Sequence, residues 1–171
     1  MIKKLIKKIL GDKASVRGTV IVRSYKAGTK ELLQELVFKN LIMQGANTGK
    51  DLIVQKMIAA YTGVDPYTLH ITHGAIGTSS TAPVISNTQL GAESARVSLT
   101  YAQDSGYNEA VLQFFFPDSA LTNQTSYEFG IFVDGTFTAN SGQLFNQVLF
   151  GTPYAKSAGV DTTVEVDITF T

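Results

Sequence analysis

Two histidines are the first residues in this chain that could bind a metal ion or act as a catalytic base. His70 and His73 lie three positions apart in a run that is typical of a strand. Successive side chains of a strand point to opposite faces, so this separation places the two rings on opposite sides of a sheet. They cannot share one ion without a bulge, and no nucleophile with an orienting partner accompanies them. We expect His73 to be a half-buried structural residue and His70 to be exposed.

Residues 45–51 contain the glycines and the lysine of a phosphate-binding loop but not their spacing. Such a loop needs four residues between its glycines, followed by lysine and a hydroxyl residue that holds magnesium. Here three residues separate Gly45 from Gly49, and Asp51 follows Lys50 where the hydroxyl should be. A carboxylate at that point repels phosphate. We therefore predict a loop that leads into a capped helix.

Three carboxylates near the end of the chain could form a calcium site or an acid/base pair. Asp161, Glu165 and Asp167 lie in a run with strict alternation, and the last two share one face of the strand. Paired carboxylates bind calcium and support hydrolysis. The opposite face is continuously apolar, which is typical of a strand with one solvated side. We interpret the acidic face as that solvated side.

Glu128 is a carboxylate inside the otherwise apolar segment 127–132. A buried carboxylate needs a partner to offset the loss of water. Arg96 is the only Arg or Lys between Lys56 and Lys156. We therefore predict a structural ion pair between Arg96 and Glu128.

The composition excludes several kinds of chemistry. The chain has no cysteine, which rules out disulfides, thiol catalysis and cysteine-bound zinc. It has no stretch of about 18 apolar residues that could span a membrane. Together with the residues above, this leads us to predict no enzymatic activity, no catalytic or cofactor-binding residue, no cofactor and no metal site.

The elements that must position these residues are mainly strands. With 171 residues, 44% apolar and 16% charged, the chain has the size of one domain and few charges for a soluble one. Residues 31–40 fit a helix or a strand, and we favour a strand that forms a hairpin with 18–25. Asp134 and Gly135 between apolar flanks predict a two-residue hairpin turn. Further strands are expected at 68–76, 96–102, 110–116, 126–133, 143–150 and 162–170.

One internal helix is predicted over residues 48–61. Asn47 or Thr48 can cap its first amides, and Asp51 lies in its first turn. The side chains expected to face the core are Leu52, Ile53, Met57 and Ile58. The fold class we predict is mainly β: an antiparallel β-sandwich with this internal helix and a short amphipathic N-terminal helix.

The first residues form a basic amphipathic segment. Nine of the first thirty residues are basic and one is acidic, whereas acidic residues dominate the rest of the chain. A helix this short needs a surface to lie against. We divide the chain into a docking segment at 1–17 and a single β-sandwich domain at 18–171. The predicted docking residues are Ile2, Lys3, Lys4, Leu5, Ile6, Lys7, Lys8 and Ile9.

Several short motifs occur in an order that is familiar from one group of proteins. A helix at 50–57 is followed by Ile76-Gly77-Thr78, by a loop with Thr81-Ala82-Pro83, and by Leu90-Gly91-Ala92-Glu93 with Arg96. Residues 127–132 add a strand of the form E-x-G-hydrophobic-F. This pattern over residues 40–171 resembles small bacteriophage tail, fibre and baseplate structural proteins, although Ser79 replaces the final glycine of their "IGTG" motif.

The resemblance implies a virion structural protein, made in the host bacterial cytoplasm. It would be a repeated component of a tail, fibre, collar or baseplate that acts by oligomeric assembly. Its expected partners are copies of itself in a symmetric homo-oligomer and other virion proteins. For the basic segment, docking onto an acidic protein ranks above binding to nucleic acid or to a membrane surface. The alternative function is a glycan-binding adhesion module that recognises the host surface.

Overall fold

The computed structural model describes residues 15–62, 67–121 and 123–171, with the side chains of 58–62 left out. The strands are β1 (Val16–Lys26), β2 (Leu32–Lys39), β3 (Leu41–Ile42), β4 (Ile71–Gly77), β5 (Glu93–Asp104), β6 (Glu109–Phe116), β7 (Thr125–Val133), β8 (Gln143–Ala155) and β9 (Val160–Phe170). The helices are α2 (Gly49–Thr62) and the short 3-10 helix η1 (Asp118–Ala120). The mainly β class and the internal helix are thus confirmed.

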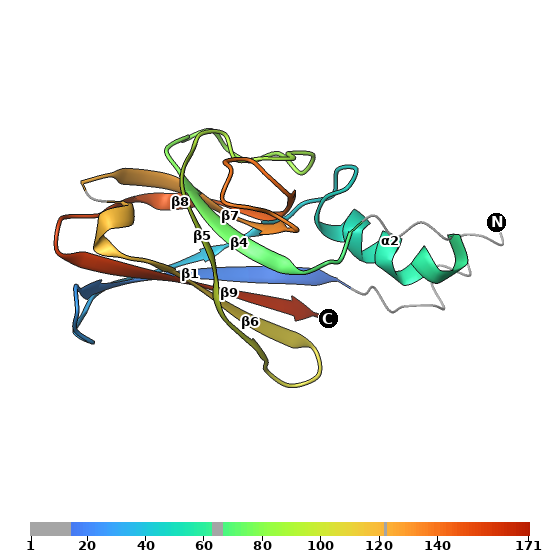
Figure 1. The fold of residues 1–171 in the computed structure, drawn as a ribbon, viewed down its shortest axis with the longest axis horizontal. Helices are drawn as coiled ribbons and strands as arrows, with labels where there is room; N and C mark the ends of the chain where they lie inside the picture. Colours follow the sequence, from blue (N-terminus) through green and yellow to red (C-terminus); the bar gives the residue numbers. More distant parts are fainter. Residues whose placement is uncertain (1–14, 63–66, 122) are drawn as a thin grey trace, which may run out of the picture.

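All the described strands belong to one antiparallel sheet that nearly closes into a barrel. Their order is β2-β1-β9-β6-β5-β4-β7-β8-β3. Strands β8, β7 and β4 form one wall and β1, β9 and β6 form the other, with β5 crossing between them (Figure 1). The hydrophobic core fills the space between the walls.

The predicted sandwich is not confirmed, because β5 joins the two walls into a single sheet. Its first half pairs with β4, from Glu93 to Ser98. Its second half pairs with β6, from Leu99 to Asp104, with a register shift between Leu99 and Tyr101. Bulges bend strands and increase their twist, which lets one strand serve both walls.

The opposite side of the barrel is bridged by the chain itself. β2 is the first strand in the sheet order and β3 is the last, yet only Asn40 separates them in sequence. The Asn40 amide N–H donates to the Gly18 carbonyl of β1 at 3.1 Å. Phe38 of β2 packs on Phe150 of β8 with ring centroids 4.9 Å apart. The barrel is therefore closed through side chains and one backbone turn rather than through a complete ladder.

Alternation along β9 fixes which side chains enter the core. Val164, Val166 and Ile168 are buried, and Glu165 and Asp167 lie on the outer face, as predicted. Phe170 does not follow the expected pattern, since 44% of it is exposed at the end of the strand. Side chains at the last position of a strand have few neighbours beyond them.

In β6 the same alternation separates three consecutive phenylalanines. Phe114 and Phe116 are fully buried, whereas Phe115 is exposed on the outer face. β6 thus contributes two large aromatic rings to the core.

Helix α2 lies at the end of the barrel where β1 begins and β9 ends (Figure 1). The Asp51 carboxylate accepts from the Asn47 amide at 2.8 Å, which satisfies a donor ahead of the first turn. Leu52 is buried in the core, but Met57 is 78% exposed, so its predicted core position is wrong. No helix in the described ranges is long and apolar enough to cross a bilayer. The predicted N-terminal helix and docking residues at 2–9 lie outside the described residues, whereas Val16 and Arg17 already belong to β1.

Candidate functional site

A buried ion pair between Glu93 and Arg96 is the centre of the most extensive polar network in the described structure. The Arg96 guanidinium donates from Nε to Glu93 Oε1 at 2.7 Å and from Nη2 to Oε2 at 2.8 Å. Only 3% of each side chain is exposed. The guanidinium carbon also lies 4.1 Å from the centre of the Phe132 ring. Two-point pairing with ring stacking fixes the arginine firmly in one geometry.

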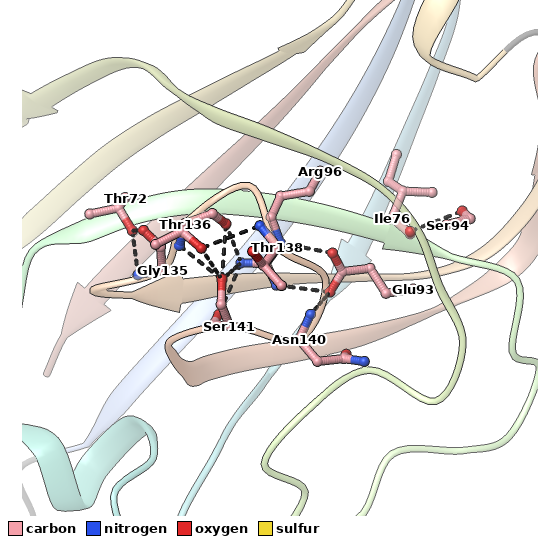
Figure 2. Close-up of polar contacts among 10 residues, drawn as sticks. All are labelled: Thr72, Ile76, Glu93, Ser94, Arg96, Gly135, Thr136, Thr138, Asn140 and Ser141. Atoms are coloured by element: carbon pink, nitrogen blue, oxygen red, sulfur yellow. Dashed lines mark hydrogen bonds and ion pairs between the residues drawn. The ribbon is translucent and has the colours of Figure 1, made fainter.

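This pair holds the loop between β7 and β8 (Figure 2). Arg96 Nη1 donates to the Ser141 carbonyl at 3.0 Å, and Glu93 Oε2 accepts from the Asn140 amide at 2.9 Å. On the other side, Thr72 Oγ1 accepts from the Gly135 amide at 2.8 Å. The loop at 134–142 is therefore bound at both of its ends to strands β4 and β5.

The predicted two-residue turn at Asp134 and Gly135 is wrong, because β7 ends at Val133 and β8 begins only at Gln143. Asp134 is held by other contacts instead: its backbone N–H donates to the His70 carbonyl, and its carboxylate accepts from the backbone N–H and hydroxyl of Thr68. Asp134 therefore links the start of the β7–β8 loop to residues 68–70 and does not close a tight hairpin.

His73 lies beside this network on β4. It is only 7% exposed, and neither ring nitrogen has a hydrogen-bond partner. Phe137 from the loop packs edge-on against the ring at 4.9 Å between centroids. Burial, and then the positive charge of Arg96, lower the pKa of His73, while the Gly135 backbone and Glu93 raise it, and the net shift is downward. The His73 side chain is thus more deeply buried than the half-buried position expected for it, whereas His70 is exposed, as expected.

Glu128 holds a second loop, at residues 78–92. Its carboxylate accepts from the backbone N–H of Gly91 at 3.1 Å and of Ala92 at 2.8 Å. It also accepts from Gln147 Nε2 at 2.8 Å, and Gln147 Oε1 in turn accepts from Asn87 at 2.9 Å. The predicted Arg96–Glu128 pair is therefore not formed: within the described structure, Arg96 pairs with Glu93, and Glu128 is satisfied by amides.

Gly77 shows why these segments must approach closely. A Cβ atom at this position would lie 2.5 Å from Glu128 Oε1 and 2.6 Å from the Ala92 carbonyl oxygen. Any larger residue would push the glutamate away from its amide donors. Gly77, Gly91 and Glu128 belong to three separate sequence motifs, and the fold brings them into one contact.

The other candidate residues remain apart from this network. Glu165 accepts from Arg23 at 2.9 Å and from Gln113 at 2.7 Å, so it belongs to a surface ion-pair cluster. Burial and the charges of Glu165 and Glu109 raise the pKa of Asp167. No group of three metal-ligating side chains is found among the described residues. The loop at 45–51 serves as the start of α2.

Glu93 and Gln147 are the important residues that we did not select from the sequence. Glu93 and Arg96 are three positions apart, which on a regular strand would place them on opposite faces. The irregular start of β5, marked by a register shift opposite Ile76 and Gly77, allows them to meet. Sequence spacing alone does not show such a shift.

No family model, curated protein or solved structure matches this chain significantly.

The network organises loops, and its charged groups are engaged in hydrogen bonds. Both carboxylates are fully engaged in hydrogen bonds, and the guanidinium is shared between Glu93 and loop carbonyls. A base in catalysis needs a placed nucleophile beside it. The arrangement is therefore suited to fixing the shape of the surface above it.

The lowered pKa of His73 predicts a pH dependence of stability. When the folded state has the lower pKa, the unfolded chain binds the proton more readily. The free energy of unfolding should therefore fall as the pH drops below about 6.5, the ordinary pKa of histidine. The measurement is urea denaturation at a series of pH values between 7.5 and 5, each about half a unit apart.

His73→Phe should abolish the part of this slope that comes from the histidine. His70→Phe is the matched control, because His70 is exposed and is the only other histidine in the chain. An equal slope in the parent and the His73→Phe variant would show that His73 is not the group responsible.

Proposed function

We propose that this protein is a structural component of a bacteriophage particle. It would be a repeated part of a tail, fibre, collar or baseplate, made in the host cytoplasm and located in the virion. It would act by oligomeric assembly with copies of itself and with other virion proteins. The proposal includes no catalysis, no cofactor and no metal.

The observation that carries the proposal is the contact among Gly77, Gly91, Ala92 and Glu128. These residues come from the three motifs that resemble small phage tail, fibre and baseplate proteins. In the fold they meet at one point and hold the loop 78–92 against the barrel. These motifs fix surface loops, and their charged groups are engaged in hydrogen bonds. Such an arrangement fits a protein that presents a rigid surface to its partners.

The exposed apolar side chains give further support. Leu32, Leu33 and Val37 on the edge strand β2 are each more than half exposed. Natural proteins usually protect edge strands with charges or cover them. Val54 and Met57 on α2 are also exposed. Surfaces of this kind are typical of contacts between subunits.

A glycan-binding adhesion module is the second candidate, supported by one shallow hollow at the tip of the β5–β6 hairpin. Its volume is about 440 Å³, and Tyr107 and Phe170 line it together with Asp104, Asn108 and Glu109. Exposed rings beside carboxylates and amides are a combination that can stack on and hydrogen-bond to sugars. This hollow is separate from the buried network.

Solution mass and glycan binding distinguish the two functions. The structural function predicts a stable symmetric oligomer of the full chain by light scattering and no binding on a glycan array. A monomer that binds a defined glycan, and loses it in the Tyr107→Ala variant, would favour the adhesion module. Tyr101→Ala is the matched control, since Tyr101 is exposed but does not line the hollow.

The basic N-terminal segment is proposed to dock on an acidic protein surface. Deletion of residues 1–11 should leave the circular dichroism spectrum and the melting temperature of the barrel unchanged while abolishing the oligomer or its incorporation into particles. The lysine charges of the segment would speed its association with the acidic surface, and its apolar face would stabilise the complex. Normal assembly of the shortened chain would refute docking, and unfolding would assign the segment to the protein's own core.

A further inference from the structure

The incomplete closure of the barrel leaves a hollow of about 420 Å³ between β1 and β3. β1 pairs with β2 only from Thr19 onward, so residues 16–18 have no strand on that side. β3 is the last strand of the sheet and pairs only with β8. Two unfinished strand edges therefore border the hollow, and Asn40 lies between them. We refer to this place, lined by Val16, Arg17, Lys39, Asn40, Leu41 and Lys50 among others, as the seam.

The seam gathers cations that have no partners. Of the described basic residues, only Arg17, Lys30, Lys39 and Lys50 form no ion pair or side-chain hydrogen bond. Three of these four line the seam, and no acidic residue lines it. Clefts lined by one sign of charge focus the electrostatic field and attract the opposite charge. The seam is therefore suited to an anionic binding partner.

The Asn40 side chain indicates that the anionic binding partner is a polypeptide. Its Oδ1 and Nδ2 atoms are both buried and both lack a hydrogen-bond partner. Leaving such atoms unsatisfied is costly, so they need an explanation. A carboxylate could accept from Nδ2 but would give Oδ1 no donor, and a phosphate has no main chain that could pair with the two open strand edges. A peptide group supplies both an N–H and a C=O, once the Asn40 side chain turns toward it.

We propose that the seam binds an extended acidic segment of another protein by strand addition. In this mode the main chain of the segment pairs with an open sheet edge, and its alternate side chains select the partner. Here the acidic side chains would meet Arg17, Lys39 and Lys50, and apolar ones would contact Val16 and Leu41. The protein's own residues 1–14 are ill suited to this place, because five lysines and one aspartate make them strongly basic.

Binding at the seam would be one step of the assembly proposed above. This inference rests on that proposed function, because the partner would be another protein of the same particle. Val16 and Arg17, which line the seam, follow residues 1–14 closely in sequence.

The test measures binding of a fluorescein-labelled peptide of eight residues with alternating Glu and Val to the full chain by fluorescence anisotropy. Lys39→Glu should weaken binding about tenfold, because an attraction becomes a repulsion. Lys30→Glu is the matched control: it removes an equally unpaired lysine and changes the net charge equally, but Lys30 precedes the opposite end of β2. Unchanged affinity in that variant is expected. Equal losses in both variants would overturn the proposal, as would equal binding of a Lys/Val peptide.

A second variant tests Asn40. Asn40→Leu should raise the melting temperature, since it removes a buried amide without partners, while it weakens peptide binding. Peptide binding that survives Asn40→Leu, or displacement of the peptide by millimolar inorganic phosphate, would identify a simple anion site and refute strand addition. A chain that forms oligomers yet binds no acidic peptide would leave the assembly function standing and refute this inference.

Discussion

Replacing Arg96 with methionine should lower the free energy of unfolding by about 3–5 kcal/mol, because it leaves the carboxylate of Glu93 buried without its cation. Both side chains are 3% exposed, so water cannot take over the role of the guanidinium. The loop 134–142 also loses the donor that binds the Ser141 carbonyl. Chemical denaturation of the variant and the parent at neutral pH measures the effect.

The double variant Arg96→Met with Glu93→Leu provides the control for this result. Removing both charges of a buried pair costs much less than removing one, because no lone charge remains in the core. The double variant should therefore be more stable than Arg96→Met alone, and the difference gives the coupling energy of the pair. If the single variant unfolds at the same denaturant concentration as the parent, the ion pair contributes nothing to the fold.

The second large effect is expected for Glu128→Leu. The change leaves the amides of Gly91 and Ala92 and the Gln147 side chain without their common acceptor. Gln147 is buried, and a buried donor without a partner costs roughly 1–3 kcal/mol, so a loss of at least this size is expected. The loop 78–92 should also become a site of proteolytic cleavage in the native protein, since loops that lose their anchors open locally.

Limited proteolysis with mass spectrometry locates the cleavage, and denaturation measures the stability. Glu31→Leu is the control, because Glu31 is exposed and its pair with Lys26 spans 3.9 Å at the surface. It should be nearly neutral for stability and should not expose the loop. Cleavage of loop 78–92 at equal rates in the parent and in Glu128→Leu would show that Glu128 does not hold the loop.

The strands were predictable from the sequence because, in a strand with one buried face, apolar and polar residues alternate. Val164, Val166 and Ile168 illustrate this, and so does the division of Phe114 and Phe116 from Phe115. The difference between a sandwich and a near-barrel was not predictable. Both give the same alternation, and only the shift within β5 and the turn at Asn40 decide how the walls are joined.

The site was predictable only in part. The burial of Glu128 and its need for partners followed from its apolar neighbours, but its actual partners are mainly backbone amides, which leave no mark on residue identity. The predicted pairing of Arg96 with Glu128 is wrong, because Arg96 pairs with Glu93, which the irregular start of β5 brings to it. The prediction for Met57 is wrong because, among the described side chains of α2, Leu52 faces the core whereas Val54 and Met57 face outward.

The position of β1 between β2 and β9 also determines when the chain can fold. β1 is synthesised well before one of its two neighbours, β9. Pairing of residues 16–26 with 160–170 requires closure of a long loop, and such distant contacts make folding slow. During synthesis the β1–β2 hairpin has one unpaired edge until β9 leaves the ribosome. We therefore expect the barrel to complete its folding only after β9 has been synthesised, and we expect truncation of β9 to leave β1 and β2 prone to aggregation.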